Sequence, residues 1–149
     1  MTDEYDVGFY LKRARVLELL RLVGIPEPEK RLGALPHELS GGMRKRAGLA
    51  RALITKPDVV FFDEPTSGLD PITKSAIYRL IEKTHAQREM TYVIISHDIR
   101  GVMDISDEIM VLNDGLIMAR GKPDELRESD DPLVRQFLTG SPDGPIKID

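Results

Sequence analysis

Two adjacent carboxylates, Asp63 and Glu64, directly follow the apolar run 59–62. We expect that run to be a strand buried on both faces of a parallel sheet, and α/β folds place their ligands at the carboxyl ends of such strands. One carboxylate there can hold Mg²⁺ through water, while its neighbour, pointing elsewhere, can polarise a water for attack on a phosphate. Taken alone, the pair is better explained as two solvated acids that end a strand.

A glycine pair, Gly41 and Gly42, follows Ser40 and precedes a basic amphipathic run. Ser40 is suited to cap the helix that begins there. The N–H groups at a helix start carry partial positive charge and bind phosphate oxygens, and glycine lets the backbone approach a ligand closely. By itself this pattern is better explained as a loop with an N-cap and no ligand.

The N-terminal third is predicted to be helical. Helical spacing covers residues 9–23, Gly24 is a predicted stop, and a short second helix is expected over 29–32. Residues 35–38 are expected to be extended. In the next helix, from Gly41 to about Thr55, the predicted inward positions are Met43, Ala47, Ala50, Leu53 and Ile54, and the predicted solvated positions are Arg44, Lys45, Arg46 and Arg51.

Alternating strands and helices follow, which predicts an α/β fold with a mostly parallel sheet. Asp70 and Pro71 suit the N-cap and first turn of a helix, whose predicted buried stripe is Ile72, Ala76, Ile77, Leu80 and Ile81. The later predicted elements are a strand over 92–96, a short helix from 99, a strand over 108–112, a hairpin turn at 113–115, an antiparallel strand over 116–119, helices opened at 123–125 and 131–132, and an extended or loose tail after Gly140.

Composition narrows the possible classes. The chain has 149 residues, a formal net charge of −4 and no cysteine. The acidic balance argues against a large nucleic-acid surface, and the lack of cysteine excludes disulfides and thiolate zinc sites. No apolar run approaches the roughly 20 residues that span a membrane.

Taken together and in this order, the motifs resemble the nucleotide-binding domain of ABC ATPases. Leu39 to Met43 resembles the ABC signature, and Val59 to Glu64 resembles the Walker B strand with its catalytic glutamate. Ser67 to Asp70 resembles the D-loop, and His97 the switch histidine. Chance agreement of all four in sequence order is very improbable.

The resemblance implies a role for each motif residue, in an ATP site shared between two subunits. Glu64 would position or activate the attacking water, His97 would contact the γ-phosphate, and Asp63 would bind Mg²⁺ through water. The signature residues would contact ATP held by the partner: Ser40, Gly41, Gly42 and Met43. The D-loop residues would signal across the dimer: Ser67, Gly68, Leu69 and Asp70. His37 and His85 match no motif and are expected to be surface histidines.

A finer resemblance is to the ATPase subunits of Mla-type phospholipid transporters. It rests on Met43, where the signature usually has Gln, and on the segments 70–73, 131–138 and 143–145. Relatives that import other apolar cargo are similar. The implied partners are a second ATPase subunit and transmembrane permease subunits, with no nucleic acid, and the implied location is cytoplasmic, on the inner face of the cell membrane.

A phosphate-binding loop of the form G-x-x-x-x-G-K-[ST] does not occur in the sequence. The one Gly-Lys pair, Gly121-Lys122, has its preceding glycine, Gly115, six positions back rather than five, and Pro123 follows it. We therefore expect an incomplete P-loop domain of ABC type, whether from a split gene, a truncated reading frame or a deliberate cut. Its expected parts are a partial helical subdomain (1–38), the C-terminal part of the ATPase core (39–140) and a tail (141–149).

Three functions remain in view. The first is part of a transporter's ATP-hydrolysing subunit, inactive alone because it lacks Walker A. The second is a non-catalytic subunit that lends its signature to a complete partner and so finishes one composite ATP site. The third, a soluble ABC ATPase of DNA repair or translation, is disfavoured because neither long coiled coils nor a tandem ATPase unit is present.

Overall fold

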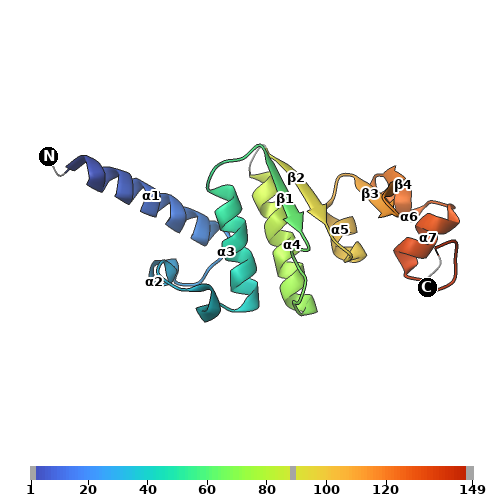
Figure 1. Ribbon diagram of the computed structural model, residues 1–149, viewed down its shortest axis with the longest axis horizontal. Helices are drawn as coiled ribbons and strands as arrows, with labels where there is room; N and C mark the ends of the chain where they lie inside the picture. Colours follow the sequence, from blue (N-terminus) through green and yellow to red (C-terminus); the bar gives the residue numbers. More distant parts are fainter. Residues whose placement is uncertain (1–2, 88–89, 147–149) are drawn as a thin grey trace. The chain divides into compact units, whose positions relative to one another are not determined.

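The computed structural model describes residues 3–87 and 90–146, which form two compact units, Met1–Ser96 and His97–Asp149 (Figure 1). The first unit is α/β with a two-stranded parallel sheet, and the second carries a two-stranded antiparallel sheet. The elements of the first unit are α1 (Asp3–Leu22), α2 (Pro28–Arg31), the 3-10 turn η1 (Pro36–Glu38), α3 (Gly41–Leu53), β1 (Val59–Asp63), α4 (Pro71–Ala86) and β2 (Thr91–Ile95).

Helix α1 begins earlier than predicted, at Asp3, but ends where expected. Gly24 adopts a left-handed conformation with φ of 70°, which favours glycine. The Arg46 guanidinium donates to Val23 O at 3.0 Å and to Gly24 O at 3.3 Å, so it caps the carbonyl end of α1. The prediction that Arg46 is solvated was therefore wrong, because its side chain fastens α3 to α1.

Residues 35–38 are not fully extended, as predicted, but form the turn η1 over Pro36–Glu38. Pro36 supplies the fixed φ of a first helical position, and the Glu38 carboxylate accepts a hydrogen bond from the Leu35 N–H at 2.6 Å. This reciprocal cap stabilises a single turn immediately before the glycine pair.

Strands β1 and β2 pair in parallel, with Val60 opposite Tyr92 and Phe62 opposite Ile94. Only one face of this pair is covered, which corrects the prediction of a strand buried on both faces. Val60 is 5% exposed and packs into a core built from α1, α3 and α4, whereas Phe61 is 71% exposed. The uncovered face carries four apolar side chains, Val59, Phe61, Val93 and Ile95, together with Asp63 and Thr91.

Helices α3 and α4 cover the other face, with α4 running alongside β1 (Figure 1). Leu49, Ala50 and Leu53 of α3 are buried, as are Ile77, Tyr78, Leu80, Ile81 and Thr84 of α4. Two predicted core residues lie outside. Ile72, in the first turn of α4, is 84% exposed, and Ile54, directly after the last residue of α3, is 40% exposed.

The second unit comprises α5 (Ile99–Ile105), β3 (Ile109–Asn113), β4 (Leu116–Gly121), α6 (Pro123–Arg127) and α7 (Pro132–Thr139). The predicted hairpin is confirmed. Asp114 and Gly115 have φ of 49° and 75°, as a type I′ turn requires, and β3 and β4 pair antiparallel. Met103, Leu126 and Val134 form a small core beside this hairpin.

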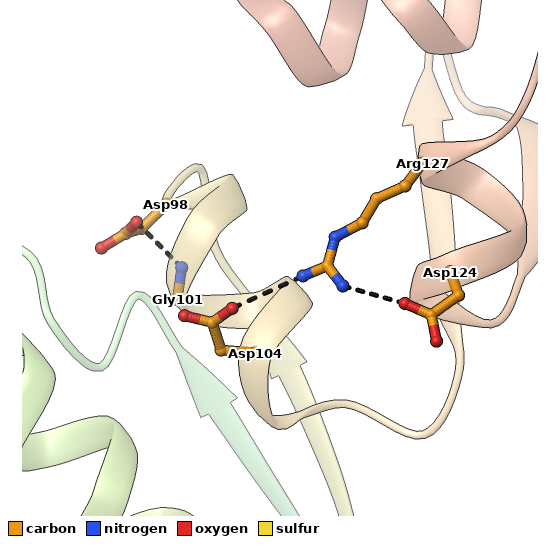
Figure 2. A network of polar contacts seen from close by, with 5 residues as sticks. All are labelled: Asp98, Gly101, Asp104, Asp124 and Arg127. Atoms are coloured by element: carbon orange, nitrogen blue, oxygen red, sulfur yellow. Dashed lines mark hydrogen bonds and ion pairs between the residues drawn. The ribbon is translucent and has the colours of Figure 1, made fainter.

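An arginine joins two helices of the second unit (Figure 2). Arg127 contacts Asp124 at 2.9 Å within α6 and Asp104 of α5 at 3.5 Å. Both pairs are exposed to solvent, so each adds little to stability.

The segment after Gly140 is held in place up to Ile146, which corrects the prediction of a loose tail. The amide of Gln136, itself buried, donates to Ile146 O at 2.8 Å and accepts from the Ile146 N–H at 2.7 Å. A Cβ atom on Gly144 would lie 2.4 Å from this amide, so glycine is required there.

Replacing Val60 and Phe61 with the same residue tests the one-sided burial of β1. We expect Val60→Thr to lower the free energy of unfolding by about 1–3 kcal/mol, because it buries a hydroxyl group. Phe61→Thr should change it by less than about 0.5 kcal/mol, since that side chain is already in solvent. Urea unfolding measures both, and equal losses would show that both faces are covered.

The two hydrogen bonds between the Gln136 side chain and the Ile146 backbone predict a local effect on hydrogen exchange. Gln136→Ala should speed exchange of the Ile146 amide by roughly tenfold, the factor for losing about 1.4 kcal/mol of hydrogen-bond stabilisation. The neighbouring variant Arg135→Ala should leave this rate unchanged, because its side chain points to solvent. If the Ile146 amide were as well protected in the Gln136 variant as in the wild type, these hydrogen bonds would not be what holds the segment.

Candidate functional site

The start of α3, the end of β1 and the start of α4 meet within the first unit. Lys45 Nζ of α3 donates to Glu64 O at 3.0 Å. Cβ atoms built on Gly41 and Gly42 would lie 3.4 Å from Leu69 Cδ2 and 3.0 Å from Thr73 Cγ2. The predicted signature therefore lies against the predicted D-loop at Gly41 and Leu69, and Lys45, which follows the signature in α3, contacts the end of the predicted Walker B strand.

Ser40 caps α3 as predicted. Its Oγ accepts from the Met43 N–H at 3.2 Å, which leaves the N–H groups of Gly41 and Gly42 at the free start of the helix. Arg44 folds back and donates to Leu39 O at 2.6 Å, fixing the chain that enters the cap. The start of α3 thus presents backbone donors and a concentrated positive potential, the requirements for contacting a phosphate.

Glu64 has a left-handed backbone, with φ of 46°. Non-glycine residues adopt this conformation at a cost of order 1–3 kcal/mol, and such residues cluster at functional sites. The Glu64 N–H donates to Ile95 O of β2 at 2.9 Å, while its carbonyl accepts from Lys45. Strand β2 and helix α3 thereby hold this backbone on both sides, and Asp63, the last residue of β1, is exposed.

The loop from Glu64 to Asp70 is compact. Ser67 N–H donates to Glu64 O at 3.2 Å, Leu69 N–H donates to Thr66 O at 3.3 Å, and Gly68 has φ of 74°. Thr66 is 1% exposed and its hydroxyl donates to the Tyr78 hydroxyl at 3.3 Å. This buried contact anchors the loop to α4.

Asp70 caps α4 as predicted. Its Oδ1 accepts from the Ile72 and Thr73 N–H groups at 3.0 Å each, and its Oδ2 accepts from the Thr73 hydroxyl at 2.5 Å. The Thr73 hydroxyl, followed by the Thr73 N–H, holds the pKa of Asp70 below its usual range. The carboxylate is therefore charged at neutral pH and suits the positive end of α4.

His97 belongs to the second unit and lies directly before Asp98, the N-cap residue of α5. It is exposed, and its carbonyl accepts from the Ile99 N–H at 3.1 Å. Asp98 caps α5 by accepting from the Gly101 N–H at 3.3 Å (Figure 2). The local turn therefore sets the backbone of His97 at the helix start.

Three residues of this site were missed by sequence reasoning. Lys45 was predicted to be solvated but bonds the Glu64 carbonyl, Thr73 links Asp70 to Gly42, and Tyr78 anchors Thr66. Only Thr73 carried a local signal, since a Thr three residues after an N-cap Asp can share its carboxylate. The others depend on contacts between distant segments.

Asp63 fits a magnesium ion that is bound mainly by water and phosphate. Mg²⁺ commonly uses one or two carboxylates together with substrate phosphates and waters. Within the described residues, no group of three or more His, Asp or Glu side chains could enclose a metal ion.

The comparisons with known proteins agree with this arrangement. The ABC transporter family profile matches residues 3–67. The Escherichia coli (strain K12) intermembrane phospholipid transport system ATP-binding protein MlaF is 42% identical over 136 residues, covering 91% of this chain and 49% of MlaF. The probable ribonucleotide transport ATP-binding protein mkl of Mycobacterium leprae is 43% identical over 131 residues, covering 88% of this chain and 37% of mkl.

Solved structures of ATP-binding cassettes share the fold. Clostridium perfringens cbiO1, part of the ABC transporter complex cbiONQ, matches with a TM-score of 0.71 and 32% identity, over 85% of this chain and 49% of cbiO1. The ADP conformation of the cassette MJ1267 matches with a TM-score of 0.72 and 25% identity, over 93% of this chain and 57% of that one.

The chain spans about half the length of the curated relatives it matches, 49% of MlaF and 37% of mkl. The matched half includes the glycine pair at a helix start, the strand that ends in two carboxylates and the capped helix after it. The chain therefore carries part of an ABC transporter domain, matched over residues 3–67, and shares the fold of solved ATP-binding cassettes.

Proposed function

We propose that this chain forms part of the ATP-hydrolysing subunit of a transporter that moves phospholipid or another apolar cargo. One observation carries the proposal: the start of α3, the end of β1 and the start of α4 pack against one another within the first unit. Lys45 bonds Glu64, and the two glycines lie against Leu69 and Thr73. A site that serves two nucleotides at once needs this juxtaposition.

The proposed roles follow from the chemistry of each group. Gly41, Gly42 and Met43, with Ser40, offer helix-start donors to the phosphates of ATP held by a second subunit. Glu64 accepts a proton from the attacking water or orients it. The free start of α3, uncluttered by side chains at the two glycines, supports the first role.

The remaining residues serve the nucleotide of their own subunit or the dimer contact. Asp63 would hold Mg²⁺ through water, and that ion would neutralise developing phosphate charge when bound. His97 would donate to the γ-phosphate, which its exposure at a helix start supports. Ser67, Gly68, Leu69 and Asp70 would carry information between the subunits, as a D-loop does.

The phosphate loop is the part of the site that these 149 residues do not supply. Its lysine and nested N–H groups hold the β- and γ-phosphates in P-loop ATPases. We infer that Glu64 acts only when another segment or subunit brings that loop. The partners would be a second ATPase subunit and transmembrane permease subunits, at the inner face of the cell membrane.

The cargo assignment rests on the names of the relatives and on the sequence segments that resemble Mla-type ATPase subunits. MlaF is named for phospholipid transport and mkl for ribonucleotide transport, at 42% and 43% identity. We favour phospholipid because the match to MlaF covers the larger share of both chains. Among the described residues, no helix has the length and apolarity to cross a bilayer.

A non-catalytic role is the second candidate. The capped start of α3 is complete within the first unit, so it can serve a partner's ATP without a phosphate loop of its own. In that case Asp63 and Glu64 would have no nucleotide to act on.

A chimera separates the two candidates. The part of E. coli MlaF that precedes the matched region would be joined to this chain, and ATP hydrolysis measured. We expect the chimera to be active and Glu64→Gln to lower the rate at least about 100-fold, the usual contribution of a general base. Glu82→Gln, an exposed substitution of the same kind on α4, should have no effect.

The unjoined chain should show no hydrolysis above the level of its Glu64→Gln variant. Activity in the unjoined chain that this substitution abolishes would contradict the need for a supplied phosphate loop. A folded chimera that Glu64→Gln leaves fully active would exclude the catalytic role and leave the non-catalytic one.

A further inference from the structure

Thr73 makes three different contacts with two functional segments. Its N–H donates to Asp70 Oδ1 at 3.0 Å, and its hydroxyl donates to Asp70 Oδ2 at 2.5 Å. Its methyl group faces the other way, toward α3. A Cβ atom on Gly42 would lie 3.0 Å from Thr73 Cγ2, so the two helix starts approach as closely as a glycine allows.

The position of this methyl group is fixed. Thr is stiff about χ1 because Cβ carries two heavy atoms. Rotation that moved Cγ2 away from Gly42 would also swing the hydroxyl away from Asp70 and break its bond. The methyl therefore cannot give way to a bulkier neighbour without loosening the cap of α4.

The neighbouring contact, between Gly41 and Leu69, is of the same kind as that between Gly42 and Thr73 but is less close. A Cβ atom on Gly41 would lie 3.4 Å from Leu69 Cδ2, an ordinary van der Waals distance. The flexible end of a leucine can shift at little cost, whereas the tethered Thr73 methyl cannot. The constraint between the two segments is thus concentrated at Gly42 and Thr73.

We propose that Thr73 is a positioning residue that couples Asp70 of the D-loop to Gly42 of the signature. The names of the two segments rest on the proposed function, while the coupling itself does not. A shift of the Asp70 cap moves the Thr73 methyl, and with it the Gly42 N–H that would face a phosphate. The nucleotide contact on one side of the subunit and the dimer contact on the other therefore share one side chain.

Compensating substitutions test this coupling in the 149-residue chain by urea unfolding. Gly42→Ala should lower the unfolding midpoint, because the new Cβ meets the tethered methyl. In a Thr73→Ser background the same substitution should raise the midpoint, because serine keeps the hydroxyl without the methyl and Ala is a better helix former than Gly. In a Thr73→Val background, which keeps a methyl but loses the hydroxyl bond to Asp70, Gly42→Ala should lower the midpoint by less than in the wild type, because the untethered side chain can give way.

Amide resonances give a second readout that simple loss of stability does not move. Thr73→Ser should shift the Gly42 and Met43 amide signals with little change at Ile72, whose bond to Asp70 is kept. Ser75→Ala, which removes a hydroxyl that bonds only Pro71 O at 3.1 Å, should leave the Gly42 signal in place. If Gly42→Ala does not fold, recovery of folded protein in the Thr73→Ser double variant is the measured rescue.

Equal effects of Gly42→Ala in the wild-type, Ser and Val backgrounds would overturn the coupling, as would a double variant no better folded than Gly42→Ala. None of these measurements uses nucleotide or a second subunit. A failed rescue therefore counts against Thr73 alone, and an inactive MlaF chimera counts against the proposed function alone.

Discussion

The left-handed backbone of Glu64 is the constraint on which the rest of the site depends. With φ of 46°, it ends β1, directs the chain into the loop toward α4, and is held by β2 through Ile95 O and by α3 through Lys45. Either bond alone would fix one neighbour, but together they set the start of α3 against the loop. The cost of this conformation, of order 1–3 kcal/mol, is offset by both bonds and by the core beneath them.

Around this turn, small residues decide how closely the segments approach. Gly42 meets the Thr73 methyl, and Gly41 meets Leu69. The Ser40 hydroxyl caps α3 and the Asp70 carboxylate caps α4, so both helix starts are ordered before any ligand arrives. The first unit therefore holds both helix starts in place through its own side chains.

Features that depend on neighbouring residues in sequence could be predicted. The caps at Ser40 and Asp70, the stop at Gly24 and the turn at Asp114-Gly115 all follow from local chemistry, and so do the order and type of the elements. Features that depend on distant contacts could not: the exposure of Phe61, the arginine cap by Arg46 and the tail held by Gln136. For the site, sequence pattern found the motifs, but the contacts of Lys45 and Thr73 needed the fold, and the catalytic roles remain proposals.

The central claim is that the start of α3 is offered to a nucleotide held by another subunit. The most direct measurement follows the backbone amide resonances of Gly41, Gly42 and Met43 in the labelled chain. We predict that they shift when ATP and full-length E. coli MlaF are added together, and that ATP alone leaves them unchanged. Equal shifts with ATP alone, or no shift with both present, would contradict the account.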